Sequence, residues 1–348
     1  MAGQIADDVA AATLLADYQS RKSPNTLRRQ RADLALFTRY LTEAGVPLQQ
    51  ELMDNLEAWH GITAGLVDGF VRWQLQQSYA LGSVNVRLAT IKSYCMLAAR
   101  AGVLESGRLA LIQAVRGYRQ AEAHQVDAKR IQAGLATRRR GAKKAEATRL
   151  SLTQAERLKV HAPHGVKQAR DRLLLCLALN QGLRVGEIAS LNVGSFNLEA
   201  GQFTFYREKV HLTQTHWLED ETCEAVRMYL QERKLQLHAE QTAVAMEGAV
   251  DETNVDQAPL FIGPCSKQRI SVRTLRARVR ALGQKVGIER LSPHDGRHAW
   301  ATQAARAGTD LKSLQDGGGW NSPAMPLRYI ASATIANEGV KLRKERGL

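Results

Sequence analysis

The chain has 348 residues, which is enough for two domains of ordinary size, each with its own hydrophobic core. Lysine and arginine outnumber aspartate and glutamate by 48 to 34, and the formal net charge of +14 favours a polyanionic partner, above all nucleic acid. The four cysteines are widely spaced without a CxxC pair, which argues against a zinc ribbon and a disulfide framework, and no apolar run reaches membrane-helix length. We therefore expect a cytoplasmic, nucleoid-associated protein with no membrane partner.

Helical patterns fill the first 117 residues. Ser23-Pro24-Asn25-Thr26 is a helix start, and the apolar residues at 27, 34, 37 and 41 then share one face up to a stop at Gly45 and Pro47. A second helix is predicted from Thr63, and a third is predicted to be capped by Ser83 and to carry the apolar residues Val84, Leu88, Ile91 and Met96. Basic side chains lie off these apolar faces, and four of them are candidates to contact a duplex: Arg28, Arg29, Arg87 and Lys92.

Residues 118–148 predict a basic joint between two domains, residues 1–117 and residues 149–348. Periodicity weakens here, and Arg138-Arg139-Arg140-Gly141-Ala142-Lys143-Lys144 has five charges in seven residues. Such a segment crosses a phosphate backbone without reading bases, so contacts from Arg138, Arg139 and Arg140 would depend strongly on salt. An ordinary solvated linker has the same composition.

The second domain is predicted to be mostly helical with a small antiparallel sheet. It begins at Ser151-Leu152-Thr153-Gln154, followed by an apolar helix over 173–179. Residues 201–205 and 216–218 are predicted strands, the first supported by the alternation in Gln202-Phe203-Thr204-Phe205. Residues 241–258 are acidic and rich in small residues, which predicts a surface loop.

Two arginine motifs suit the binding of a phosphate. In Gly182-Leu183-Arg184-Val185-Gly186-Glu187-Ile188, Arg184 follows a glycine suited to a helix C-cap. A guanidinium stays protonated and offers forked donors that match phosphate oxygens. Taken alone, such an arginine is most often an ordinary surface residue.

Ser292-Pro293-His294-Asp295-Gly296-Arg297-His298 starts a helix. Ser292 is suited to the N-cap, Pro293 to the first position and Asp295 to the third. His294 and Arg297 then share one face at a helix end that favours an anion. Simple capping with both side chains solvated is the alternative, whereas a metal pair with His298 is disfavoured because no third ligand is apparent.

Gly317-Gly318-Gly319-Trp320 is followed nine residues later by Tyr329. A phenol with a reference pKa of about 10 is scarcely ionised at pH 7, so as a nucleophile it needs a proton acceptor or cationic surroundings. The indole N–H of Trp320 can donate one hydrogen bond to a phosphate oxygen. Each ring alone is also compatible with ordinary packing in a core.

In order and spacing these stretches resemble the tyrosine recombinase (phage integrase) family, by motif over residues 150–335 and more weakly over residues 20–115. The resemblance implies six catalytic residues and two supporting ones, Glu187 and Asp295; the six are Arg184, Lys209, His294, Arg297, Trp320 and Tyr329. Lys209 matches a hairpin lysine that acts as general acid in the family, with Arg207 and His211 as alternatives. The three glycines before Trp320 depart from the family pattern and raise the entropy cost of ordering this helix end.

The resemblance further implies a fold and an activity. The fold would pair an all-helical core-binding domain with a catalytic domain in a C-shaped clamp around DNA. The activity would be site-specific recombination through a 3′-phosphotyrosine intermediate and a strand-exchanged junction, without cofactor or metal. Implied partners are double-stranded DNA carrying recombination sites, three further copies of the chain in a synapsed tetramer, and accessory DNA-bending proteins. The basic tail, residues 330–348, would dock on a neighbouring copy.

Related chemistry leaves other readings open. A type IB topoisomerase or a hairpin-forming resolvase would use a similar set of residues, although the two-domain layout and the length favour the recombinase. A DNA-binding architectural or regulatory protein is an alternative from a different class. A covalent DNA adduct that is lost on Tyr329→Phe separates an enzyme from such a binder.

Overall fold

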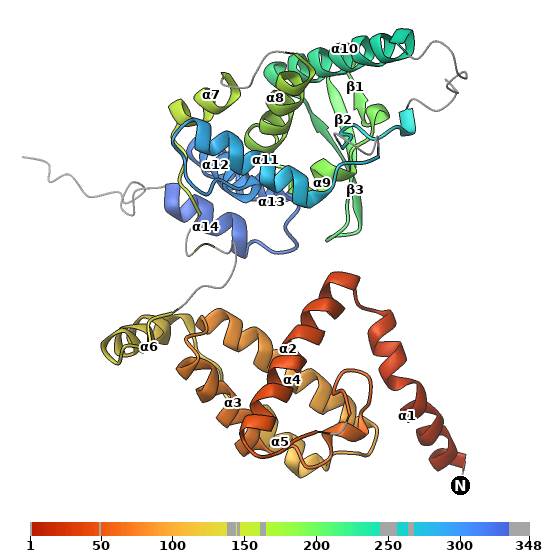
Figure 1. Cartoon of the computed structure of the whole chain (residues 1–348), viewed down its shortest axis with the longest axis vertical. Helices are drawn as coiled ribbons and strands as arrows, with labels where there is room; N and C mark the ends of the chain where they lie inside the picture. Colours follow the sequence, from red (N-terminus) through yellow and green to blue (C-terminus); the bar gives the residue numbers. More distant parts are fainter. Residues whose placement is uncertain are drawn as a thin grey trace, which may run out of the picture. The chain divides into compact units, whose positions relative to one another are not determined.

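The computed structural model describes residues 2–48, 50–137, 144, 147–160, 165–243, 256–263 and 268–333. The chain forms two compact units, Met1–Lys144 and Ala145–Leu348 (Figure 1). No helix among these described residues combines the length and the apolar character that crossing a bilayer requires.

The first unit is all-helical in its described residues. Its core is rich in aromatic rings, and Phe37, Trp59, Phe70 and Tyr94 are fully buried. Trp59 keeps its indole N–H satisfied by donating to the Leu52 carbonyl at 2.9 Å. The elements are α1 (Ala2–Ser20), α2 (Pro24–Glu43), η1 (Glu57–Trp59), α3 (Ala64–Gln76), α4 (Leu81–Arg100), α5 (Ser106–Ala114) and α6 (Gln120–Gln132).

Two of the three predicted helix starts in this unit are confirmed. The Ser23 and Thr63 hydroxyls accept from the backbone N–H groups of Thr26 and Leu66, each at 3.3 Å. The prediction for α4 was wrong in two respects: its N-cap is Ala80 rather than Ser83, and Met96 is 48% exposed. Ala80 caps through backbone geometry alone, because it is extended and its side chain makes no cap bond, so composition gave no signal.

The predicted joint contains helix α6. Its Arg130 donates through Nη2 to the carbonyls of Leu75 and Tyr79, at 3.1 and 3.0 Å, which ties α6 to the first unit. The predicted DNA contacts Arg138, Arg139 and Arg140 lie outside the described residues.

The second unit consists of helices with a small sheet at one side (Figure 1). Its elements are α7 (Leu152–Val160), α8 (Val166–Leu179), α9 (Val185–Ser190), η2 (Val193–Ser195), β1 (Phe196–Asn197), β2 (Gln202–Arg207), β3 (Leu212–Trp217), α10 (Asp220–Ala243), α11 (Val272–Lys285), α12 (Pro293–Arg306), α13 (Leu311–Gly318) and α14 (Ala324–Ala333). The sheet is antiparallel in the order β1-β2-β3. The predicted fold class, mainly α with a small antiparallel sheet, is confirmed. Both long strands differ in their bounds from the prediction, and residues 244–255 of the predicted loop lie outside the described residues.

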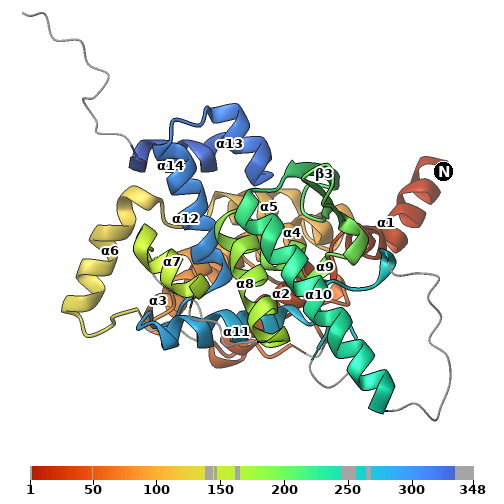
Figure 2. The ribbon, with the colours of Figure 1, turned by 90° about the horizontal axis from the view of Figure 1, so that it is seen from above.

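Helix α8 is the central element of the second unit. All seven residues from 173 to 179 are buried, and α10 runs alongside the helix (Figure 2). Helix α12 crosses α8 at Gly296, where an added Cβ would lie 3.2 Å from Ala178, and α14 packs on α12 beside α13. The C-terminal helices are thereby held against the buried central helix of the unit.

Candidate active site

The start of α12 is fixed by Asp295. Its carboxylate accepts from the backbone N–H and the hydroxyl of Ser292, both at 2.7 Å, and from the backbone N–H of Thr148 at 2.8 Å. The predicted helix start is confirmed. The bond from Thr148 ties the first residues of this unit to the end of α12 that carries His294.

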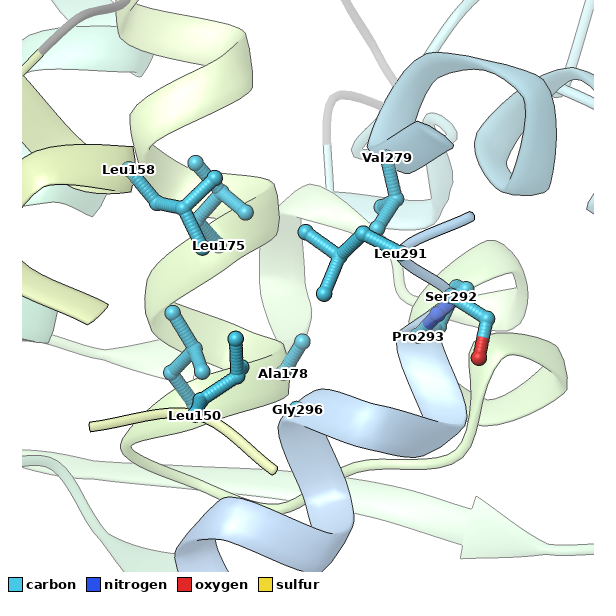
Figure 3. A pocket seen from close by; sticks show the side chains of 10 residues that line it. Leu150, Leu158, Leu175, Ala178, Val279, Leu291, Ser292, Pro293 and Gly296 are labelled. Carbon is cyan, nitrogen blue, oxygen red and sulfur yellow. The ribbon is translucent and has the colours of Figure 1, made fainter. Parts of the chain in front are cut away.

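An apolar recess lies against the same helix end. A recess between α7, α8 and α11 is lined by Leu158, Leu175, Val279 and Leu291, and Pro293 and Gly296 close it from α12 (Figure 3). Apolar contacts of this kind hold the first turn of α12 against α8. This packing positions the helical turn that carries His294.

Glu187 joins two arginines. It is buried, accepts from the backbone N–H and Nη1 of Arg184, both at 2.8 Å, and accepts from Nη1 of Arg207 at 3.2 Å. Arg207 is fully buried, and burial lowers its pKa. A buried cation of this kind is stable only with a partner, which Glu187 provides.

The three glycines at the end of α13 bind arginines through their carbonyls. Arg207 donates to Gly317 O at 2.6 Å and to Gly318 O at 3.2 Å; Arg184 donates to Gly319 O at 2.8 Å; Arg297 also donates to Gly318 O. Gly319 caps α13 in the left-handed region at φ 56°, and an added Cβ on Gly318 would overlap the Trp320 ring. Residues 317–319, which we call the glycine seat, thus bind three guanidinium groups through their carbonyl oxygens.

Arg297 lies between this seat and Trp320. It is 2% exposed, donates to Gly182 O at 2.7 Å, and its Cζ lies 4.6 Å from the centre of the Trp320 ring. Burial, followed by the positive charge of Arg184, lowers the pKa of Arg297 to about 9. The side chain is still cationic at pH 7, and an added anion would relieve the repulsion between the arginines.

Tyr329 packs beside Trp320, with ring centres 5.6 Å apart, and is 5% exposed. Its hydroxyl lies 3.1 Å from Nδ1 of His298, and Nε2 of His298 lies 3.0 Å from Nε2 of His294. Burial raises the pKa of Tyr329, and the opposing charge of Arg297 offsets this only in part. The phenol is therefore protonated at rest.

Lys209 is exposed in the turn between β2 and β3. Burial, followed by the positive charges of Arg297, Lys209 and Arg184, lowers the pKa of His294. Lys209 thus acts on His294 through its charge, and no described hydrogen bond links it to the buried arginines. Of its two alternatives, Arg207 is engaged in the glycine seat and His211 bonds the Tyr206 hydroxyl through Nδ1 at 3.1 Å.

The candidate DNA contacts of the first unit differ in how they bond to groups of the unit itself. Arg29 donates to Asp33 at 2.7 Å, and Lys92 donates to the carbonyls of Gln113 and Val115 at 2.7 and 2.6 Å. Arg87 donates to Gln74 at 3.0 Å and stacks on Tyr79. Arg28 is exposed and bonds its neighbour Asn25 at 3.2 Å. Three of the four are thus tied into the unit's own structure.

Two residues of the site were assigned no role from the sequence. The sequence predicts Arg207 only as an alternative to Lys209, and His298 only as half of a disfavoured metal pair. The signal for His298 was its spacing from His294, four residues on one helix. No local pattern marked Arg207, whose partners Glu187 and Gly317 are 20 and 110 residues away.

Comparison with known proteins identifies relatives of the chain. The family model described as "Phage integrase family" matches residues 148–335. The chain is 27% identical over 312 residues to tyrosine recombinase XerD of Xanthomonas axonopodis pv. citri, covering 82% of this chain and 89% of the relative. It is 32% identical over 150 residues to tyrosine recombinase XerC of Pelotomaculum thermopropionicum, covering 42% of this chain and less than half, 44%, of the relative.

Solved structures share the fold. The Tn1549 transposon integrase in complex with transposon right end DNA superposes with a TM-score of 0.59 at 13% identity, covering 93% of this chain and 96% of that one. The XerH recombinase bound to palindromic difH substrate gives a TM-score of 0.55 at 17% identity, covering 86% and 74%. At these identities the likeness concerns the fold alone.

Proposed function

We propose that Tyr329 is the nucleophile of this chain, which belongs to the phage integrase family and is a tyrosine-type site-specific recombinase that cleaves and rejoins DNA. One observation carries the assignment: the Trp320 ring contacts both the buried Arg297 guanidinium, at 4.6 Å, and the Tyr329 ring, at 5.6 Å. A hydrogen-bond donor for phosphate, a cation and a phenol thus lie in one cluster.

The proposal gives a chemical role to two arginines, the indole, the phenol and one lysine. Arg184 and Arg297 bind the oxygens of the scissile phosphate and neutralise the charge that grows on them in the transition state. Trp320 donates its indole N–H to the same phosphate. Tyr329 attacks phosphorus and forms a 3′-phosphotyrosine, while Lys209 protonates the departing 5′ oxygen. Glu187 and Asp295 hold Arg184 and His294 in place.

The proposed partner is double-stranded DNA that carries a specific recombination site. Both units contact the duplex in this proposal, with residues 1–117 as the core-binding domain and residues 149–348 as the catalytic domain. Four copies synapse two sites through a strand-exchanged junction, with accessory DNA-bending proteins as candidate helpers. Family membership supports this assembly.

The proposal is tested with a suicide duplex library, nicked so that cleavage traps the enzyme on its DNA. Wild-type protein is expected to form a covalent adduct that survives denaturing electrophoresis, and Tyr329→Phe is expected to form none, because it lacks the attacking oxygen. Sequencing of the trapped DNA identifies the target site. Tyr229→Phe, in the core of the same unit on α10, is the matched control and is expected to retain the adduct.

Two results would count against the assignment. An adduct that persists in Tyr329→Phe moves the nucleophile elsewhere. Tight binding by the wild type without any adduct favours a regulatory DNA-binding protein that retains the fold without turnover.

A further inference from the structure

Tyr329 is the first member of a hydrogen-bonded row of three side chains. Its hydroxyl contacts Nδ1 of His298 at 3.1 Å, and the opposite nitrogen of that ring, Nε2, contacts Nε2 of His294 at 3.0 Å. The rings stand edge to face, with centres 5.3 Å apart for His298 and Tyr329 and 4.4 Å apart for the two histidines. The two histidines lie one helical turn apart on α12, and Tyr329 comes from α14, which packs on it.

In each hydrogen bond of this row, one choice of donor and acceptor is favoured. Two facing Nε2 atoms can bond only if one of them carries hydrogen. In the described part of the chain, His298 Nδ1 is the sole hydrogen-bond partner of the Tyr329 hydroxyl. If Nδ1 were the donor, the phenol proton would be left without an acceptor in a buried place, which is unfavourable. The satisfied arrangement has the phenol donating to Nδ1, and His298 Nε2–H donating to His294.

From this geometry we infer that His298 is the proton acceptor for Tyr329, with His294 behind it as the group that orients its ring. The inference rests on the proposed function, since it concerns how the proposed nucleophile loses its proton. It assigns a catalytic part to a residue outside the six that the family resemblance marks.

The proton balance of cleavage is complete with this assignment. As the bond from the Tyr329 oxygen to phosphorus forms, the phenol O–H bond breaks and its proton passes to His298 Nδ1. The bond from phosphorus to the 5′ oxygen breaks, and that oxygen takes a proton from Lys209, the proposed acid. Rejoining runs the same steps backwards, so His298 returns its proton to the phenol oxygen.

The charges around His298 keep it ready to accept a proton. Burial, then His294 and Arg297, lower the pKa of His298, and the Asp295 carboxylate opposes them. Arg297 and Arg328 act on the phenol in the favourable sense, because both lower the pKa of Tyr329 against the effect of burial. At pH 7 His298 is therefore neutral, as a base must be.

The experiment separates proton transfer from positioning. In His298→Asn the amide oxygen stands near the place of Nδ1 and can accept the phenol hydrogen bond, but it cannot take the proton. We expect single-turnover adduct formation on a saturating suicide duplex to slow about 100-fold, the low end of what a general base contributes. DNA affinity and thermal unfolding are expected to stay near wild type. His298→Gln, which keeps more of the bulk, is expected to be equally slow, and His124→Asn, exposed on α6, serves as the matched control.

A fluorinated tyrosine at position 329 supplies the decisive readout. Its more acidic phenol needs less help from a base, so we expect the His298→Asn defect to shrink about tenfold or more when it replaces Tyr329. A purely structural role for His298 would leave the defect the same with either phenol. That result, or a His298→Asn rate within about threefold of wild type, overturns the inference. Absence of any adduct in the wild type would instead count against the proposed function.

Discussion

Buried charges dominate the candidate site at the scale of single residues. Arg207, Arg297 and Glu187 are each at most 6% exposed, so each would be strongly destabilising without its partners. Two of the partners are backbone carbonyls of one short run, Gly317 and Gly318. Neutral oxygens satisfy hydrogen bonds without cancelling charge, which leaves the cluster net positive and suited to a phosphate.

His216 is a half-buried histidine beside this cluster. Its Nε2 lies 3.5 Å from Nη2 of Arg207, and burial, followed by Arg207, lowers its pKa from 6.5 to about 4. Because the folded chain resists protonation here and the unfolded chain does not, stability should fall as pH drops from about 6.5 to about 4. The expected loss attributable to His216 is on the order of 3 kcal/mol.

Urea denaturation of the full chain at several pH values measures this effect. His216→Gln keeps an acceptor where Nε2 stands and does not titrate, so its stability should fall less than that of the wild type over the same range. The difference should vanish above pH 7, where the wild-type imidazole is neutral in both states. Parallel curves for the two proteins would show that His216 does not resist protonation in the fold.

The end of α13 is the element on which the site depends. Its last two helical residues and its cap are glycines, and their carbonyls receive three arginines. Gly318 has no room for a side chain, because a Cβ there would overlap the Trp320 ring. At Gly317 a Cβ would lie 3.6 Å from Trp300, an ordinary contact. The two neighbours should therefore respond in opposite ways to the same substitution.

We predict that Gly318→Ala displaces Trp320, destabilises the protein by about 1–3 kcal/mol and slows cleavage about tenfold or more. Gly317→Ala is the matched control, and it should cleave near the wild-type rate and gain about 0.5–1 kcal/mol from the higher helix propensity of alanine. Thermal unfolding and single-turnover cleavage measure both variants. Equal behaviour of the two would mean that Trp320 is not held by the glycine run.

The sequence correctly predicts those elements whose signals are local. The start of α12 was predictable because Ser292, Pro293 and Asp295 cap within one turn. The cap of α4 at Ala80 and the glycine seat were not, because backbone geometry and partners more than 100 residues away decide them. Arg29 and Lys92 bond to Asp33 and to two carbonyls, partners that charge alone does not reveal, and their contact with DNA stays a prediction.

The whole molecule combines a basic surface with two compact units. The formal charge of +14 favours binding along a phosphate backbone, a contribution that weakens as salt rises. The domain boundaries predicted from sequence, 1–117 and 149–348, leave α6 in the joint, whereas contacts through Arg130 tie this helix to the first unit. All the proposed catalytic residues belong to the second unit.

Locating the covalent bond itself shows whether Tyr329 carries the DNA during cleavage. The trapped adduct is treated with nuclease and trypsin, and the peptide that retains a nucleotide remnant is sequenced by tandem mass spectrometry. We expect the remnant to be attached through its 3′ phosphate to the Tyr329 oxygen, in the peptide of residues 329–341. A remnant on any of the other seven tyrosines, or on another kind of residue, would contradict it.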